Sequence, residues 1–514
     1  MKKILFAGTF VLLNMFCAFA QNMTIENVHK FHLRNADAIK EGSDVKGYYF
    51  FYISDKIDKN TNEYTLRIMD NNLKLLKDIK FQDSKYVRIL ESSFNSTDLI
   101  FLFYNSDAKT FEYQVYGADG NKKFAYNREL TKKEKRYLEQ SYFMVDDDEQ
   151  TYKGLYPVDG EGFISNMPSR EDKDYTFQID FFSTAKRKQW TYTPTIGGKK
   201  FVGDYLGTFN GVVYLEVLKF TSMMDQKPES SILGLSLENG RQVFEKPTDG
   251  KYRFYPASMS VMNNGKAYIY GEYFNENGNI AKDKSLGFAF WGVDEKGVIL
   301  SEKYCSWSLD LGKFLDVSSK GKIDNFGFMY LHNILQTADG NIFAIGEGYM
   351  KVASALGILA KLATRNADIS TVKIKVTDML LIRFDKDFNV KDAKIYDKNS
   401  NSVELQSGME FVSTPLIGKM VKYYYGEFDY AYTQTNKDNT SFTVCYSDYV
   451  RGKDYKGSTF NSISYNEGKL TTDRINTKSD ASRSAVFPGK QGQVLILEYY
   501  RKAKRVEAHF EKLN

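Results

Sequence analysis

Residues 286–304 read LGFAFWGVDEKGVILSEKY, and residues 265–274 before them read GKAYIYGEYF. The apolar runs are short and rich in aromatic and β-branched side chains, which fit the pleated, half-buried surface of a sheet. Turn residues such as Asn, Asp and Gly separate one run from the next. The two segments together predict four consecutive antiparallel strands.

The same unit recurs along the whole chain. Its strands and hairpins repeat about every 45–65 residues, which suits a propeller blade of four strands. The turns Asp119-Gly120, Asn239-Gly240 and Glu467-Gly468 suit hairpin positions that need a positive φ. The units lie near residues 38–81, 86–127, 152–193, 201–246, 254–304, 329–397 and 411–475.

The two ends of the chain complete the count. Residues 482–514 hold about three strands, and the segment from Thr24 to Leu33 can supply a fourth. A ring closed by strands from both termini leaves no exposed sheet edge. We therefore predict an all-β fold, a β-propeller of eight blades, with seven as the alternative count. The rival architecture is two or three separate β-sandwich domains, but no Pro-, Ser- or Gly-rich linker marks a boundary, so residues 21–514 are predicted to form one domain.

One segment resembles a known repeat. Residues 337–346 read TADGNIFAIG and are similar to the T-x-D-G-G-x-x-x-x-G segment of many bacterial β-propeller repeats, where it links the first two strands of a blade. Asn341 stands where those repeats usually have a second Gly, and NNGKA at 263–267 is a weaker copy. The whole chain also resembles a group of uncharacterised secreted proteins of Gram-negative bacteria. The resemblances imply a propeller and an exported protein, and they imply no known chemistry.

The N-terminus has the pattern of a cleavable signal peptide. Lys2 and Lys3 precede an apolar stretch, and Ala18-Phe19-Ala20 supplies the small-x-small cleavage pattern, so residues 1–20 are expected to be removed. Cys17 follows the bulky Phe16, whereas lipoprotein processing needs a small residue there. We expect an exported protein in the periplasm or at the cell surface of a Gram-negative bacterium.

Charge and cysteine content exclude several classes of protein. The formal net charge is +5, and it falls to +3 without Lys2 and Lys3. So mild a balance argues against nucleic acid as a partner and against a polybasic membrane binder. Cys305 and Cys445 remain after cleavage. They either form one disulfide or serve as two buried strand residues, and the second interpretation is favoured.

Three segments interrupt the repeat. Residues 128–149 begin with a capping box and end in an acidic cluster, which we interpret as a solvated loop rather than a calcium site. The insertion at about 351–377 is apolar, and it either covers one end of the propeller or docks on a partner or membrane. Residues 413–458 are rich in tyrosine, which suits strand packing, stacking on a sugar or contacts with a protein, and strand packing is favoured. The candidate interaction surface consists of Leu356, Ile358, Leu359, Leu362, Tyr423, Tyr424 and Tyr425.

No catalytic or cofactor motif is found in the sequence. The four histidines lie outside HExxH and CxxC contexts, and a G-x-S-x-G elbow, a P-loop and a dinucleotide fingerprint are missing. We therefore expect no cofactor and no metal site. The basic cluster of Arg501, Lys502, Lys504 and Arg505 is interpreted as a solvated turn in preference to an anion site.

Three functions remain, and the fold does not choose among them. The leading hypothesis is a monomeric, non-enzymatic scaffold that binds an envelope protein or a glycan. The second is a glycan-active enzyme, because paired carboxylates leave no spacing signature in a sequence. It predicts Asp or Glu side chains with raised pKa in the central funnel. The third is an envelope component that touches the membrane through residues 352–363.

Overall fold

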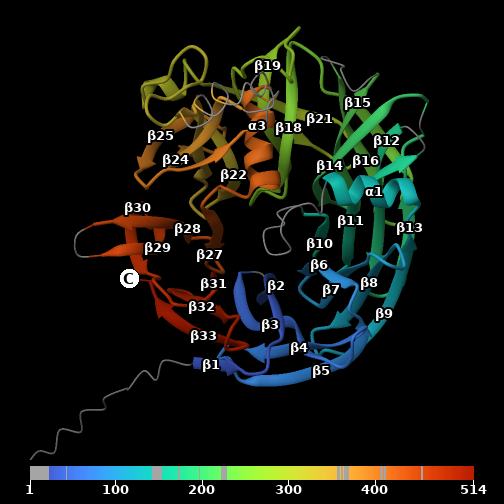
Figure 1. Cartoon of the computed structure of the whole chain (residues 1–514). Helices are drawn as coiled ribbons and strands as arrows, with labels where there is room; N and C mark the ends of the chain where they lie inside the picture. Colours follow the sequence, from blue (N-terminus) through green and yellow to red (C-terminus); the bar gives the residue numbers. More distant parts are fainter. Residues whose placement is uncertain are drawn as a thin grey trace, which may run out of the picture.

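The computed structural model of the chain describes a ring of sheets around a central axis (Figure 1). It describes residues 22–41, 43–141, 153–171, 174–195, 197–221, 228–355, 370–405, 412–452 and 455–513, with residues 359, 363 and 409. The described strands form eight antiparallel sheets, each with four strands in meander order. The fold is a β-propeller of eight blades, as the sequence predicts.

The first strand of each blade lies nearest the axis, and the fourth lies at the rim (Figure 1). The first three blades consist of β2 (Lys30–Glu41), β3 (Asp44–Lys56), β4 (Thr61–Asp70) and β5 (Leu75–Ser84); β6 (Val87–Phe94), β7 (Asp98–Asn105), β8 (Thr110–Gly117) and β9 (Lys122–Glu129); and β10 (Leu155–Val158), β11 (Gly162–Glu171), β12 (Asp174–Ser183) and β13 (Arg187–Tyr192). Helix α1 (Lys132–Ser141) lies between the second and third blades.

The next four blades repeat the arrangement. They consist of β14 (Lys200–Phe209), β15 (Val212–Phe220), β16 (Glu229–Ser236) and β17 (Gln242–Pro247); β18 (Tyr252–Val261), β19 (Ala267–Asn275), β20 (Gly287–Val293) and β21 (Ile299–Ser306); β22 (Phe328–Gln336), β23 (Ile342–Ala353), β24 (Val372–Phe384) and β25 (Val390–Tyr396), with β26 (Asn401–Glu404) added beside β24; and β27 (Tyr430–Thr435), β28 (Ser441–Arg451), β29 (Lys456–Asn466) and β30 (Lys469–Asn476). The short helices are η1 (Leu311–Lys313), α3 (Thr414–Met420) and η2 (Val421–Tyr425).

The eighth blade joins the two ends of the chain. It contains β31 (Arg483–Pro488), β32 (Gln493–Tyr500) and β33 (Arg505–Lys512), and its outermost strand is β1 (Asn22–Ile25). Strand β1 pairs antiparallel with β33, with Ile25 opposite Val506. In Figure 1 the blue N-terminal strand accordingly lies beside the red C-terminal strands. The strand from the N-terminus is shorter than the predicted Thr24–Leu33 segment, because β2 of the first blade already begins at Lys30.

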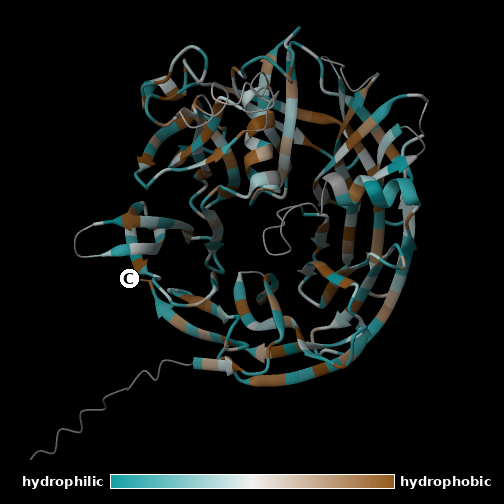
Figure 2. Cartoon of the chain, viewed as in Figure 1, coloured by the Kyte–Doolittle hydropathy of each residue, from teal (hydrophilic) through white to brown (hydrophobic). Residues whose placement is uncertain are grey.

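Hydrophobic side chains pack at the seam between each pair of neighbouring blades. In β7, Leu99, Phe101 and Phe103 belong to the core shared with the first blade, whereas Ile100 and Leu102 belong to the core shared with the third. Alternate residues of a strand point to opposite faces of its sheet, so one middle strand supplies two seams. Figure 2 shows this pattern as hydrophobic residues spread along the strands of every blade.

Several local predictions are confirmed. Gly120, Gly240 and Gly468 all adopt positive φ, at 77°, 71° and 82°. At the start of α1, the backbone N–H of Glu134 donates to Thr131 Oγ1 at 3.1 Å, which is one of the two bonds of the predicted capping box. The carboxylate of Glu134 pairs with Arg128.

The two cysteines behave as the favoured interpretation requires. Cys305 and Cys445 are buried and unbonded, and they lie in β21 of the fifth blade and β28 of the seventh. They therefore serve as small core residues.

The meander gives the ring two different faces. The turns between the first and second strands of a blade, and between the third and fourth, leave from one face. The second-to-third turns and the connections between blades leave from the other, which we name the funnel face. The connection 130–154, the insertion after β23 and the connection 405–429 all leave from the funnel face. The long connections that interrupt the repeat therefore all lie on the funnel face.

Ring closure should depend on the short strand β1. Ile25 is 2% exposed, and it packs with residues of the eighth and first blades. Ile25→Ala is expected to lower the free energy of unfolding by about 2–4 kcal/mol, because it leaves a cavity in the seam that closes the ring. Urea denaturation of residues 21–514 measures the change. Leu76→Ala, at a residue 62% exposed in β5, is the control and should change it by less than about 0.5 kcal/mol. Equal effects of the two substitutions would contradict closure through β1.

Candidate functional site

The connection between the sixth and seventh blades passes over the funnel face. We name its residues 412–429 the crossing segment. Tyr349 Oη donates to the carbonyl of Thr414 at 2.6 Å, and Lys351 Nζ donates to the carbonyl of Val412 at 2.8 Å. Ser413 binds the fifth blade, because its Oγ donates to the carbonyl of Ile280 at 2.6 Å. These bonds fix the start of α3 over the inner strands β18 and β22, where Figure 1 shows it.

The side chains of α3 and η2 point to two different faces of the helical segment. Ile417 and Val421 are buried in a hydrophobic cluster with strands of the sixth blade. Lys419, Lys422 and Tyr423 lie on another face, since residues three and four apart are neighbours on a helix. The segment therefore packs on the propeller with one face and presents two lysines and a tyrosine to the funnel with the other.

Lys419 ties the helix to the fourth and fifth blades. Its Nζ lies 2.8 Å from Asp204 Oδ2 on β14 and 2.9 Å from Glu216 Oε2 on β15. The same ammonium lies 4.6 Å from the centre of the Tyr255 ring on β18. Burial alone would lower the pKa of Lys419, but Asp204 and Glu216 outweigh it and raise the pKa. This lysine therefore holds the segment against two blades.

A cavity of about 300 Å³ lies beneath the segment. The inner strands of four consecutive blades, the third to the sixth, form its wall. Tyr156 and Tyr205 stack in that wall with ring centres 4.3 Å apart. We name it the funnel cavity, and its side chains are mostly aromatic or cationic: Tyr156, Tyr205, Tyr255, Tyr330, Tyr423, His332, Lys153, Lys419 and Lys422, with Glu272.

Lys422 differs from Lys419 in its partners. Among the described residues no carboxylate lies within ion-pair distance of Lys422 Nζ, which lies 5.5 Å from the centre of the Tyr430 ring. Burial lowers its pKa, and the charge of Lys153 acts in the same direction, while Glu347 opposes it. Two lysines that repel each other across an aromatic cavity form a site for an anionic group.

Glu272 is a carboxyl group in the cavity wall. It lies on β19 opposite Tyr255, and it is half-buried. Burial raises its pKa to about 7, and a hydrogen bond with Ser285 opposes the rise. A carboxyl group that titrates near neutral pH can act as a proton donor at that pH.

A buried charge network supports the wall behind His332. His332 Nε2 lies 3.2 Å from Glu347 Oε2, and Lys398 Nζ lies 3.1 Å from Glu347 Oε1 and 2.5 Å from Asp429 Oδ2. Glu347 also accepts the backbone N–H groups of Asp429 and Tyr430, both at 3.1 Å. Burial lowers the pKa of His332 to about 4, so its ring is neutral at pH 7. The network joins the sixth and seventh blades where the crossing segment returns to the ring.

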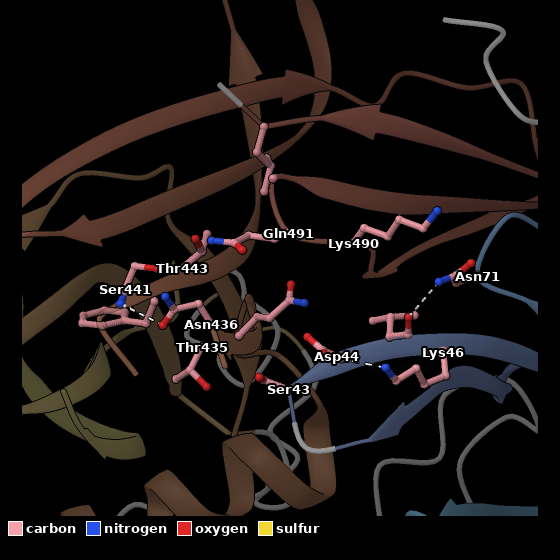
Figure 3. A pocket seen from close by; sticks show the side chains of 15 residues that line it. Ser43, Asp44, Lys46, Asn71, Thr435, Asn436, Ser441, Thr443, Lys490 and Gln491 are labelled. Atoms are coloured by element: carbon pink, nitrogen blue, oxygen red, sulfur yellow. Dashed lines mark hydrogen bonds and ion pairs between the residues drawn. The ribbon is translucent and has the colours of Figure 1, made fainter. Parts of the chain in front are cut away.

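A cavity of about 260 Å³ opens on the opposite face (Figure 3). Turns of the first, seventh and eighth blades line it with amides and hydroxyls, and several of these bind one another. Asn436 Oδ1 accepts the backbone N–H of Ser441 at 3.0 Å, and Lys46 lies 3.7 Å from Asp44. Lys490 donates to Asn72 Oδ1. This cavity is therefore a weaker candidate than the funnel cavity, whose Lys422 has no acidic partner among the described residues.

The predicted interaction surface is only partly placed. Tyr423 is 44% exposed and lines the funnel cavity, and Tyr425 is half-buried at the edge of a hydrophobic cluster. Leu359 is 64% exposed. Leu356, Ile358, Leu362, the side chain of Tyr424 and the acidic cluster 146–149 lie outside the described residues, as does the predicted signal peptide.

The residues that matter most in the cavity were not predicted from the sequence. Lys419 and Lys422 lie on helical residues within the tyrosine-rich segment 413–458, for which no helix was predicted. A start signal was present, because Ser413 precedes Pro415 in the first turn, and Gly426 ends the segment with φ at 69°. No sequence signal placed Glu272 in the wall, because it sits in an ordinary strand.

Two kinds of feature are absent from the part of the chain that the structure describes. No helix there is long and apolar enough to span a membrane. Groups of three or more His, Cys, Asp or Glu side chains arranged to hold a metal ion do not occur there either.

Comparison with known proteins connects the chain to a family. The family of unknown function DUF6770 matches residues 1–514. Curated proteins give no match. Among solved structures, the quinohemoprotein alcohol dehydrogenase ADHIIG from Pseudomonas putida HK5 is 9% identical with a TM-score of 0.43, covering 96% of this chain and 76% of that one. The WD40 domain of SCAP from fission yeast is 8% identical with a TM-score of 0.36, covering 95% and 94%.

Prolyl oligopeptidase B from Galerina marginata is a third similar structure. It is 10% identical with a TM-score of 0.38, and the match covers 91% of this chain and 56% of that one. TM-scores below 0.5 at such identities carry no argument about function.

Removing the charge of Lys419 should loosen the crossing segment in a pH-dependent way. At pH 8, Lys419→Met leaves Glu216, whose side chain is 1% exposed, without a counter-charge, so the free energy of unfolding should fall by about 2–4 kcal/mol. Burial raises the pKa of Glu216, and Lys419 opposes that rise in the native protein. The carboxyl group therefore takes up a proton in the variant as the pH falls, and the loss should shrink at pH 5.

Urea denaturation at the two pH values measures this difference. Lys320→Met, at an exposed lysine outside the funnel, should change the free energy by less than about 0.5 kcal/mol at both. A loss that is the same at pH 5 and pH 8 would show that the methionine disrupts packing and that the ion pair is not the cause.

Proposed function

We propose that this chain, which belongs to the family of unknown function DUF6770, is an exported binding protein whose funnel cavity holds a small saccharide with an anionic group. The observation that carries the proposal is the combination in one cavity of five tyrosine rings with Lys422, a half-buried lysine with no acidic partner among the described residues. The volume, about 300 Å³, is that of a site for a ligand of one or two rings.

The chemistry of the wall fits a sugar. Tyrosine presents a flat apolar ring, on which the C–H face of a sugar can stack, and a hydroxyl that can bind sugar hydroxyls. The stacked pair Tyr156 and Tyr205 forms one rigid side, and Tyr423 faces the cavity from the crossing segment. Lys422 and Lys153 supply positive charge for a carboxylate or a similar group.

The proposed location is the periplasm or the cell surface, and it rests on the signal-like pattern of residues 1–20. An envelope location would place the protein among glycans, which suits the cavity. A protein partner in the envelope, a monomeric state and a membrane contact through residues 352–363 remain hypotheses from the sequence. Cell fractionation of the native strain tests the location directly.

A saccharide screen on residues 21–514 tests the proposed site. Neutral and carboxylate-bearing mono- and disaccharides are compared by thermal shift, because a ligand that binds only the folded state raises the melting temperature. At least one carboxylate-bearing sugar should raise it. Tyr423→Ala and Lys422→Gln should each weaken that binding by at least about tenfold, which is about 1.4 kcal/mol.

The matched control is Tyr449→Ala. Tyr449 is 38% exposed, close to the 44% of Tyr423, but it lies on β28 away from the cavity. Its replacement should leave the affinity unchanged. The proposal fails if no saccharide raises the melting temperature, or if Tyr449→Ala weakens binding as much as Tyr423→Ala does.

A second candidate function is glycan hydrolysis in the same cavity. The observation that favours it is Glu272, whose burial raises its pKa to about 7 within reach of a ligand. Such a group is a general acid for the departing oxygen of a glycosidic bond. Under this hypothesis the bound saccharide is a substrate and Glu272 touches it.

Glu272→Gln tests both the titration and the chemistry. A raised pKa means that the folded state holds its proton more tightly, so the native protein loses stability as the pH rises from about 4.5 to 7. The glutamine mimics the protonated form, so the variant should be more stable than the native protein at pH 8, by on the order of 1–3 kcal/mol, and equal at pH 4.

Chromatography of the products from the saccharide that binds measures the reaction. Hydrolysis should be lost in Glu272→Gln and kept in Glu276→Gln, which changes an exposed residue. Intact saccharide after prolonged incubation with the native protein would exclude catalysis and leave the binding function in place.

A further inference from the structure

Four connections meet on the funnel face at the seams of the eighth, first and second blades. They are the link from β1 to β2, the turn from β3 to β4, the link from β5 to β6 and the turn from β32 to β33. Together they enclose a concave groove of about 590 Å³. The groove is formed by different blades from those that line the funnel cavity, and both open on the same face.

Backbone hydrogen bonds hold these connections together. The N–H of Val28 donates to the carbonyl of Lys504 at 2.7 Å, and the N–H of His29 donates to the carbonyl of Ile53 at 2.8 Å. The N–H of Lys85 donates to the carbonyl of Asn60 at 2.7 Å. The side chains on these connections therefore project from a fixed frame and not from independent loops.

The charge of the groove has one sign. None of its lining residues, all of which the structure describes, is an Asp or a Glu. Most of the cations are exposed, whereas Lys30 and the two histidines are half-buried. We name it the basic groove, and its cationic lining is Lys30, Lys56, Lys85, Arg88, Arg501 and Lys504, with His29 and His32.

Two acidic residues at the turn from β3 to β4 are used locally. Asp58 accepts the N–H groups of Asn60 and Thr61, at 2.6 and 2.8 Å, and so closes its own turn. Asp55 accepts the N–H of Lys56 at 2.8 Å. These carboxylates shape the turns that bear the lysines, and they do not line the groove.

The surroundings of His29 in the groove lower its pKa. Burial lowers the pKa of His29, Lys56 and Lys504 lower it further, and Asp55 opposes them. So local an excess of cations is unexpected in a chain with a formal net charge of only +5. The basic cluster at 501–505 was interpreted from the sequence as a solvated turn. In the structure, four lysines and arginines from other blades line the same groove as Arg501 and Lys504, which favours an anion site.

We propose that the basic groove binds an acidic polysaccharide, a chain that carries a carboxylate on successive sugars. Exposed lysines and arginines spread along a concave track can contact several anionic groups of one extended chain. A flat membrane surface would not reach the floor of the groove, where Tyr52 and Tyr64 lie at 4% and 0% exposure. This groove would extend the recognition of a charged glycan beyond the funnel cavity, but it does not depend on that cavity.

The probe is an oligogalacturonate of about ten sugars, with a neutral galactan oligomer of equal length as its control. Residues 21–514 should bind the charged oligomer and not the neutral one. Affinity should fall at least about tenfold between 50 and 200 mM NaCl, as for other contacts between several cations and a polyanion. Fluorescence anisotropy of a labelled oligomer measures both quantities.

Charge reversal at two positions localises the site. Lys56→Glu with Lys504→Glu should weaken binding at least about tenfold. The matched control is Lys296→Glu with Lys386→Glu, which makes the same change in net charge at exposed turns on the opposite face and should change affinity less than twofold. Should the first double variant fail to fold, Lys85→Gln with Arg501→Gln replaces it.

Each other result overturns the inference. Equal losses in the two double variants would mean that only the overall charge matters. Binding to vesicles of phosphatidylglycerol without binding to oligogalacturonate would mean that the groove recognises a lipid headgroup. Loss of oligomer binding in Lys422→Gln would place the polymer in the funnel cavity, whereas no binding of the oligomer at all would remove the groove while leaving the proposed function of that cavity untouched.

Discussion

Packing of the middle strands on both faces is the constraint on which this fold depends. A residue such as Phe101 packs against the first blade, and its neighbour Leu102 packs against the third. Strands of this kind cannot alternate apolar with polar residues, because neither face meets water. The continuous apolar runs in the sequence are the direct result, and each seam joins two blades into the ring. The short strand β1 completes the last blade.

The same constraint explains why the functional features gather at one end. Strand interiors must fill the seams, so only the connections are free to vary. The meander sends every link between blades to the funnel face, together with the second-to-third turns. The crossing segment and the basic groove both arise from these connections, whereas the strands beneath them contribute single residues such as Glu272 and Tyr255.

Much of the fold could be predicted from the sequence, and little of the site. The eight blades follow from repeated apolar runs and from turns such as Asn239-Gly240, which are local signals. The basic groove could not be predicted in this way, because Lys56, Lys85 and Lys504 come from three connections that only the ring brings together. Lys419 of α3 and Lys422 of η2 could not be placed for another reason. Their helical segment is short, and its local signals are the Ser-Thr-Pro start and the Gly426 end.

The two lysines of the crossing segment show how burial and pairing together define a site. Lys419 has two carboxylates and an aromatic ring, so its charge is already balanced and it serves to position the helix. Lys422, one turn later, is half-buried, and no carboxylate of the described chain pairs with it. Burial of a lysine without a paired carboxylate lowers the stability of the fold, because a charged group loses its hydration and gains no counter-charge. Such a cost is tolerated where a ligand supplies the missing charge, so Lys422 supports the proposal of an anionic ligand more strongly than the shape of the cavity does.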